Sequence, residues 1–464
     1  MTDKTTNKSE QFSEDHIRHN RRVQITGSFF SKMADTLANT KIVLPALFNA
    51  IAAPTVLVGL IAPIRESFSM LPQVAIKSWV AHSSKAHRIY VAGGIFQAVA
   101  LCCMLVSFLT LDGWTGGLAI LGALLAMSLA RSLCSLSSKT VLGATVPKSK
   151  RGSLMGAAGT FAGGISILLG VALALYAQHK NANDNATGNL ANAEITDISS
   201  VLSQDLSANI WILASLLAVA ALSFLIAAFC YLAIRWAKSG PSDTANKDQH
   251  TEDDHRRNQA QNRETQNSSA WQSIRNDRVF LKFVVTRAFM MVSALAMPYV
   301  ASLSLSSAES ALLTFGILIL LEGGSALLSS RLWGNASDKN SRAVLIGTAL
   351  ASAVLCSICA VQLRLGDEAP AWFWLAIYAA LSTTHQGVRL GRKTYIVDLA
   401  DGAEDSNNKR TEYVAISNTA IGVLLLVFGL SSAVIANTSL FSMFIVFAIC
   451  AAIASGLGLR LKAI

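Results

Sequence analysis

The sequence predicts an all-α integral membrane protein with twelve transmembrane helices in two pseudo-symmetric six-helix bundles. Of its 464 residues, 52% are hydrophobic and 14% are charged, whereas a soluble chain usually carries about a quarter charged residues. The charges gather in short stretches, and the apolar blocks between them reach about 20 residues, enough to cross ~30 Å of hydrocarbon as a helix. The blocks do not alternate polar and apolar residues as the strands of a membrane barrel would. Helical spans are therefore expected.

Six apolar blocks form the first predicted bundle, residues 27–236. They follow a polar tail, residues 1–26, which lacks the apolar core of a cleaved signal peptide, so the first block is expected to stay in the mature protein. Basic residues follow the second and the fourth block and mark the ends of these spans. The six spans are predicted at 27–50, 54–80, 90–111, 116–142, 153–177 and 209–236.

A polar linker, residues 237–278, separates this bundle from the second one, residues 279–464. Its stretch 239–269 is rich in Asp, Asn, Gln, Lys and Arg and nearly free of large apolar residues, so it cannot bury enough surface to fold alone. The second bundle again has six apolar blocks. Its spans are predicted at 279–303, 310–333, 343–363, 371–397, 412–436 and 439–459.

The distribution of basic residues predicts which loops face the cytoplasm. Lys and Arg gather in the tail and after the even-numbered spans, whereas the opposite loops, including 178–208, carry mainly Asp and Glu. By the positive-inside rule, both termini and the linker are cytoplasmic, and we expect the protein in the bacterial inner membrane. The same distribution accounts for the net charge of +10 without nucleic acid as a partner.

Motifs of several other protein classes are missing from the sequence. All seven cysteines lie in apolar blocks, and the pair Cys356 and Cys359 has neither a second pair nor a nearby His, so no disulfide and no metal site is predicted. There is no Gly-x-x-x-x-Gly-Lys-Ser/Thr loop for ATP phosphates. No convergent nucleophile and base indicate an enzyme. We expect no cofactor.

The two halves of the sequence repeat each other. Trp79 and Trp333 open two similar segments that lie 254 residues apart (333 − 79). The same separation relates Lys85 to Lys339, Arg88 to Arg342, and the dipeptide Lys139-Thr140 to Lys393-Thr394. A constant register across two spans favours a duplicated six-helix unit, in which two halves rock about a central site.

With these residues the chain resembles the major facilitator superfamily over nearly its whole length. That family carries a Gly-x-x-x-Asp-Arg/Lys-x-x-x-Arg-like loop after its second and its eighth helix. The second copy here has all four residues, and the first has Val80 and Ser84 in place of the Gly and Asp. The resemblance implies secondary transport by alternating access, with these loops as a cytoplasmic latch. The latch residues are Gly334, Asp338, Lys339, Arg342, Lys85 and Arg88.

Two further family motifs are incomplete in this sequence. Proton-coupled members often carry Arg followed by Gln-Gly in the fourth helix, whereas here Arg131 stands alone and its repeat partner His385 precedes Gln386-Gly387. The fifth span is rich in glycine but lacks the Gly-Pro step of the family's antiporters. Proton-antiport drug efflux therefore stays an alternative function.

Polar side chains at bilayer depth are costly and usually face a cavity, so each one is a candidate for the substrate or proton pathway. The resemblance implies that spans one, four, seven and ten line this cavity. Structural roles remain open: Lys41 and Arg287 could snorkel to an interface, and His385 could be a neutral hydrogen-bonding group. The candidates are Asp35, Asn39, Lys41, Arg65, Glu66, Arg131, Arg287, Glu322, His385 and Arg389.

From these observations we expect a monomeric secondary active transporter of a small solute. Proton coupling is assigned to Glu66, Asp35 or Glu322, since a carboxyl at this depth can exchange protons as its surroundings change. The basic residues in the spans outnumber the acidic ones, which favours an anionic or zwitterionic solute. A non-transporting sensor or scaffold that keeps the transporter fold is the other alternative.

Overall fold

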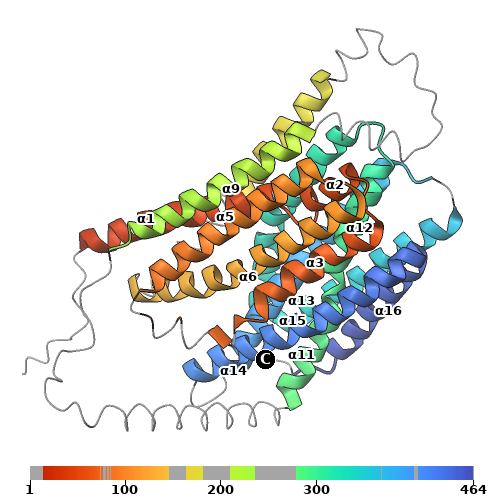
Figure 1. The fold of residues 1–464 in the computed structure, drawn as a ribbon. Helices are drawn as coiled ribbons and strands as arrows, with labels where there is room; N and C mark the ends of the chain where they lie inside the picture. The colour runs from red at the N-terminus through yellow and green to blue at the C-terminus, as the bar shows by residue number, and fades with distance from the viewer. Residues whose placement is uncertain are drawn as a thin grey trace, which may run out of the picture.

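The computed structural model describes residues 14–73, 75–76, 80, 83, 85–145, 163–180, 210–235, 278–366, 368–401 and 406–462 (Figure 1). All regular secondary structure in these ranges is helical. The first half contains α1 (Glu14–Leu37), α2 (Val43–Ala50), α3 (Thr55–Met70), α5 (Ala86–Thr110), α6 (Gly113–Thr145), a helix over 163–180 and α9 (Ile210–Leu232). The second half contains α11 (Arg278–Met290), α12 (Val292–Ser306), α13 (Ala311–Leu365), α14 (Ala371–Asp401), α15 (Ser406–Thr438) and α16 (Leu440–Gly458).

The first predicted span is interrupted rather than continuous. α1 begins at Glu14, well before the expected start, and ends at Leu37, whereas α2 begins only at Val43. In the gap, the Oδ1 atom of Asn39 accepts a hydrogen bond from the backbone N–H of Lys41 at 2.8 Å. Asn side chains compete in this way with the helical pattern of backbone hydrogen bonds. The break places Lys41 on the turn between α1 and α2.

Breaks also divide the second half. The seventh predicted span is split at Met291 into α11 and α12. α13 covers both the eighth and the ninth predicted span, with Asn340 between them in a non-helical conformation (φ −162°, ψ 90°). The Oδ1 atom of Asn340 accepts from the N–H of Ala343 at 2.9 Å, so Asn340 caps the second part of α13.

The all-α membrane fold is confirmed. Within the described residues, eight segments are long and apolar enough to cross a membrane, and two of them are the parts of α13 before and after Asp338. The remaining four predicted spans correspond to α1 with α2, α3, helix 163–180 and α14, which are interrupted, short or more polar. The count of twelve stays a prediction for those four.

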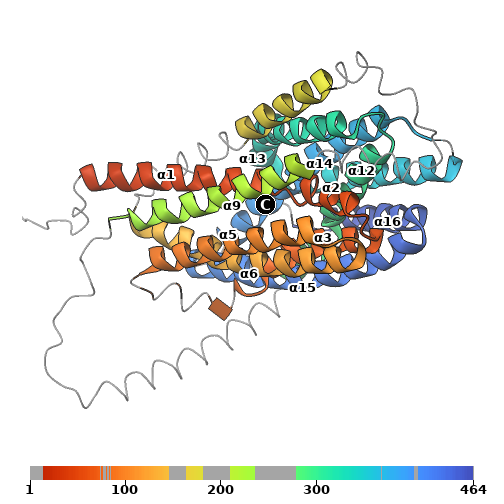
Figure 2. The ribbon, with the colours of Figure 1, turned by 45° about the horizontal axis from the view of Figure 1, so that its top comes forward.

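The helices pack as two groups that meet along two seams. In the first half α5 contacts α6 and α9, and α1 contacts α9; in the second half α13 contacts α14 and α16. One seam joins α3 to α15, and the other joins helix 163–180 to α13. Figure 2 shows α3 and α15 together along one edge of the molecule, and helix 163–180 beside α13 along the opposite edge.

The apolar core differs between the two ends of the molecule. At one end, residues of both halves form a single cluster that includes Leu44 and Phe48 of α2, Ala296 of α12 and Phe315 of α13. At the other end each half has its own cluster, one around Tyr90 and Tyr231 and one around Phe283 and Tyr395. The halves therefore share one core at the first end, whereas at the second end each has its own core, and Met70 of α3 packs against that of the second half.

Hydrogen bonds show which chain segments lie at the second end. The amide of Asn20, near the beginning of α1, donates to the carbonyl of Arg235, just after α9, and accepts from the N–H of the same residue, both at 2.9 Å. The Tyr395 hydroxyl donates to the carbonyl of Lys462 at 3.1 Å. In the predicted orientation this is the cytoplasmic end, and the end where the halves share one core would face outward.

Glycines allow the helices at both seams to approach closely. A β-carbon at Gly429 of α15 would overlap the ring of Pro63 in α3. At the other seam, a β-carbon at Gly170 would lie 2.6 Å from the N atom of Leu320 and 2.8 Å from the O atom of Gly316. Small residues permit such approaches between membrane helices, so Gly170 and Gly163, where a β-carbon would lie 2.7 Å from the Leu327 side chain, serve close packing, whereas a β-carbon at Gly164 would meet no atom within 4 Å.

Gly429→Ala is expected to destabilise the folded protein in the described conformation, because the new methyl group must push α3 and α15 apart. Overpacking typically costs about 1–3 kcal/mol, so thermal unfolding of the purified protein in detergent should begin at a lower temperature. The matched control is Gly456→Ala in α16, where a β-carbon meets no atom within 4 Å. Equal melting temperatures for the two variants would contradict the packing at this seam.

Candidate functional site

One carboxylate in the first half is shared by two guanidinium groups. Asp35 lies near the end of α1, and its Oδ1 atom accepts from the Nη2 atom of Arg65 in α3 at 2.9 Å. The same oxygen is paired with the Nη1 atom of Arg131 in α6. Arg65 is buried, at 7% exposure. Three residues predicted from separate spans therefore meet in one cluster, which keeps one excess positive charge.

A second ion pair connects the two halves. The Nζ atom of Lys41 lies 3.0 Å from the Oε1 atom of Glu322 in α13, and both side chains are largely buried. The other oxygen, Oε2, accepts from the Ser382 hydroxyl at 2.7 Å and the Tyr378 hydroxyl at 3.2 Å, both on α14. Glu322 therefore has partners for both oxygens. The pair holds the break in the first span against the second half, at the end where the halves share one core.

Arg287 and His385 are buried in the second half and have neutral partners. Arg287 of α11 donates to the Ser417 hydroxyl at 2.5 Å and to the Oδ1 atom of Asn418 at 2.9 Å, both on α15. Its Nε atom is buried and finds no acceptor among the residues that the structure describes. His385 of α14 forms a hydrogen bond through Nδ1 with the Ser293 hydroxyl of α12 at 3.0 Å.

The structure adds two cations that the sequence interpretation missed. Arg392 of α14 is half-buried and donates to the Sδ atom of Met291 at 3.4 Å. Lys32 of α1 is also half-buried and lies within electrostatic range of Asp35 and Arg389. A sequence signal for Arg392 existed, because His385, Arg389 and Arg392 follow each other at i, i+4 and i+7, on one face of a helix.

Glu66 occupies a different environment from the other two carboxylates. Its side chain is half-buried and forms no hydrogen bond or salt bridge within the described part of the chain. It interacts electrostatically with Arg65 and Arg131 of the first half and with Arg287 and Arg392 of the second. Glu66 is therefore a carboxylate at the seam between the halves with cations on both sides.

The cluster as a whole is strongly positive. Seven cationic side chains accompany three carboxylates, which leaves an excess of four positive charges (7 − 3). A positive potential between low-dielectric walls attracts anions. The cations are Lys32, Lys41, Arg65, Arg131, Arg287, Arg389 and Arg392, and the carboxylates are Asp35, Glu66 and Glu322.

Asn39 and Arg389 differ from the buried members of the predicted site. Asn39 hydrogen-bonds the backbone at the break in the first span, so it positions Lys41. Arg389 is exposed and interacts electrostatically with Glu322, His385 and Arg392. Among the described residues, no group of three or more His, Cys, Asp or Glu side chains could hold a metal ion.

One of the predicted latch residues fastens a neighbouring helix end. Arg342 donates from Nε to the carbonyl of Gly458 at 3.2 Å and from Nη2 to the carbonyl of Leu459, at the end of α16. A cation at a helix C-terminus also interacts favourably with the helix dipole. Gly334 and Lys339 lie on α13, Lys339 being exposed like Lys85 and Arg88. The side chain of Asp338 lies outside the described part of the structure.

Arg342→Gln is expected to lower both melting temperature and transport more than Arg88→Gln does. The first substitution removes two charge-assisted hydrogen bonds to carbonyls, each worth roughly 1.5–3 kcal/mol, whereas Arg88 is exposed and has no such contact in the described residues. The two arginines occupy corresponding places in the repeats, so each is the other's control. Equal losses would contradict the unequal roles of the two loops.

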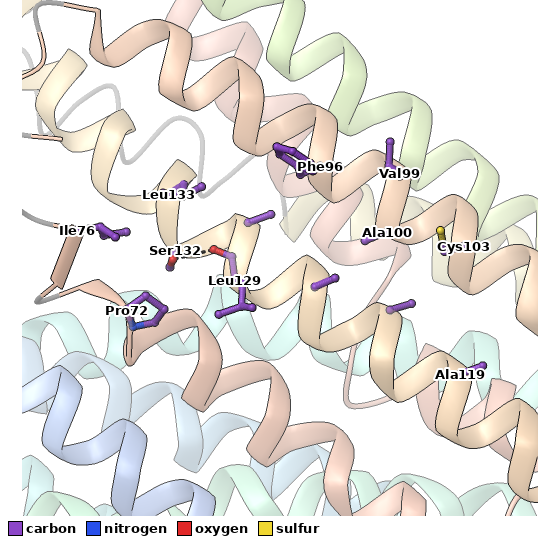
Figure 3. Close-up of a pocket in the computed structure, with 13 residues that line it drawn as sticks. Pro72, Ile76, Phe96, Val99, Ala100, Cys103, Ala119, Leu129, Ser132 and Leu133 are labelled. Atoms are coloured by element: carbon purple, nitrogen blue, oxygen red, sulfur yellow. Dashed lines mark hydrogen bonds between the residues drawn. The ribbon is translucent and has the colours of Figure 1, made fainter. Parts of the chain in front are cut away.

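An apolar groove of about 670 Å³ lies away from this cluster, on the surface of the first half. Phe96 and Val99 of α5, Leu129 and Ser132 of α6 and Pro72 beyond α3 surround it (Figure 3). Phe96 and Val99 are exposed and belong to a segment apolar enough to span a membrane. The groove contains none of the charged cluster, so the polar solute is not expected there.

Comparison with known proteins identifies the family. The model of the Major Facilitator Superfamily matches residues 25–422. The chain belongs to the major facilitator superfamily. It is therefore an integral membrane transporter, and the family consists of transporters rather than enzymes. No curated protein sequence matches the chain.

Solved structures of three transporters share the fold at low sequence identity. The D-xylose–proton symporter superposes with a TM-score of 0.62 at 13% identity, covering 96% of this chain and 98% of that one. A POT family transporter in complex with 5-aminolevulinic acid gives 0.64 at 9%, covering 95% of each. The nucleoside transporter NupG gives 0.62 at 12%, covering 95% and 99%. These similarities establish the fold but do not identify the solute.

Proposed function

We propose that this protein is a proton-coupled secondary transporter that moves a small anionic or zwitterionic solute by alternating access. It would act as a monomer in the inner membrane, with both termini in the cytoplasm. The observation that carries the proposal is the position of the Glu66 carboxylate among cations of both halves, with no hydrogen bond or salt bridge to any residue that the structure describes. The charge excess of the cluster favours a negatively charged group on the solute.

The environments of the three carboxylates suggest how protons and solute are coupled. Asp35 is neutralised by two guanidinium groups, and Glu322 has partners for both oxygens. Glu66 has no such direct partner among the described residues. It can therefore gain or lose a proton with the least rearrangement of direct contacts. When Glu66 is neutral, it no longer attracts the arginines of the other half. An anion can then take its place, which couples one proton to one negative charge.

Uptake by purified protein in liposomes tests the proposal. Vesicles with an imposed pH gradient are offered labelled anionic, zwitterionic and cationic solutes, with a protonophore as control. Accumulation of an anionic or zwitterionic solute that the protonophore abolishes is expected. Outward movement of lipophilic cations would instead favour drug efflux, and movement of no solute under any gradient would favour a sensor.

A further inference from the structure

Two guanidinium groups of the second half have no carboxylate partner in hydrogen-bond contact among the described residues. Arg287 is 5% exposed, donates to one hydroxyl and one amide oxygen, and keeps a buried Nε atom without an acceptor. Arg392 donates to the sulfur of Met291, which is a weak acceptor. In the first half, by contrast, Arg65 and Arg131 share Asp35.

The two groups are neighbours. Met291 lies four residues after Arg287, one helical turn along the chain. Arg392 contacts Met291 and also acts electrostatically on Arg287, so the two cations lie in one region of the second half. On α15, the Ser417 Oγ and Asn418 Oδ1 atoms already accept hydrogen bonds from Arg287.

Such a pair of cations is unfavourable without an opposite charge beside it. Taking an ion out of water costs several kcal/mol, and a nearby opposite charge is the usual compensation. Two adjacent cations also repel each other. A guanidinium presents its N–H groups in a planar fork that matches the two oxygens of a carboxylate or phosphate. An oxyanion of this kind would satisfy the buried Nε atom and neutralise one of the charges.

We propose that Arg287 and Arg392 bind the anionic group of the transported solute, a carboxylate or a phosphate-type oxyanion. This inference rests on the proposed function and locates the anion within the cluster. The site lies beside the core of the second half, against which Met70 of α3 also packs. Glu66 of α3 acts on both guanidiniums from the first half and competes with the solute for them.

Binding of simple oxyanions to the purified full-length protein tests the site. Melting temperature in detergent is measured with sodium acetate, phosphate or sulfate at constant ionic strength, against chloride. A ligand that binds only the folded state raises this temperature with concentration. At least one probe should stabilise the wild type, and Arg392→Gln should weaken its apparent affinity about tenfold or more, equivalent to ~1.4 kcal/mol.

Three further variants sharpen the test. Lys282→Gln removes an exposed cation from α11 and should leave the affinity unchanged. Arg287→Lys keeps the charge but loses the planar fork, so it should bind more weakly than wild type even where Arg287→Gln fails to fold. Glu66→Gln removes the competing carboxylate and should bind the probe several-fold more tightly.

Several outcomes would overturn the site. One is stabilisation by no oxyanion, and another is equal affinity in wild type and Arg392→Gln. A third is Arg392-dependent stabilisation by phosphatidylglycerol but by no free oxyanion, which would make the ligand a lipid headgroup. Transport separates the two proposals. If Arg392→Gln still accumulates an anion with unchanged KM, the proposed function stands and the proposed site is wrong. If an oxyanion binds in an Arg392-dependent way but no solute moves under any gradient, the site stands and the proposed function is wrong.

Discussion

Glu66→Gln is expected to abolish accumulation of solute under a pH gradient while exchange of solute across the liposome membrane continues. The substitution keeps the size and the hydrogen-bonding shape of the side chain but fixes it in an uncharged form. Because the uncharged form no longer holds the arginines of the second half, the two halves can still move past each other. They would do so without carrying a proton, so the gradient would no longer drive the solute.

The control for this prediction is Glu309→Gln. Glu309 is exposed between α12 and α13 and should show both activities at wild-type level. If Glu66→Gln lowers accumulation, exchange and melting temperature together, the role of Glu66 is structural. If Glu66→Gln, Asp35→Asn and Glu322→Gln all still accumulate solute, carboxylate-based coupling is wrong, and His385 or another driving ion takes its place.

The positions of most helices follow from the sequence because lipid leaves few alternatives. An uninterrupted apolar block has to satisfy its own backbone groups, so a helix is the expected result. α5, α6 and α16 lie within a few residues of the predicted spans. Where a span carries polar residues, the local competition between side chain and backbone decides instead. The break at Asn39 was therefore not predictable from the length of the block.

The partners of the charged residues were harder to predict than their depth. The sequence places Asp35, Arg65 and Arg131 at bilayer depth, but their contact depends on how α1, α3 and α6 are rotated about their axes. Lys41 reaches Glu322 only because a turn interrupts the helix. A carboxylate and an amine in separate halves have no sequence relationship to reveal the pair. Arg392 is the opposite case, since its spacing from His385 and Arg389 was visible.

Lys41→Met is expected to weaken the end at which the halves share one core. The substitution removes the cation and leaves Glu322 largely buried, with only two hydroxyl donors. Breaking a buried pair from one side typically costs about 3–5 kcal/mol. This contact exists only while the two halves meet at the end where they share one core. Its loss therefore raises the free energy of the described conformation and shifts the population toward a conformation in which that end is open.

Labelling of a single cysteine measures this shift. Ala296→Cys in a cysteine-free variant places the thiol in α12, the helix that packs against α2, at a position that is fully buried in the described conformation. A membrane-impermeant maleimide should modify it faster in Lys41→Met and in Glu322→Gln than in the parent. In Lys41→Glu with Glu322→Lys the rate should return toward the parent value, because the charges still attract and the Tyr378 and Ser382 hydroxyls can rotate to accept hydrogen bonds.

Equal labelling in the parent and both single variants would show that the pair does not hold this end closed. Failure of the double variant alone would assign the effect to Glu322 and its hydroxyl partners, since a double-mutant cycle isolates the pairwise contribution.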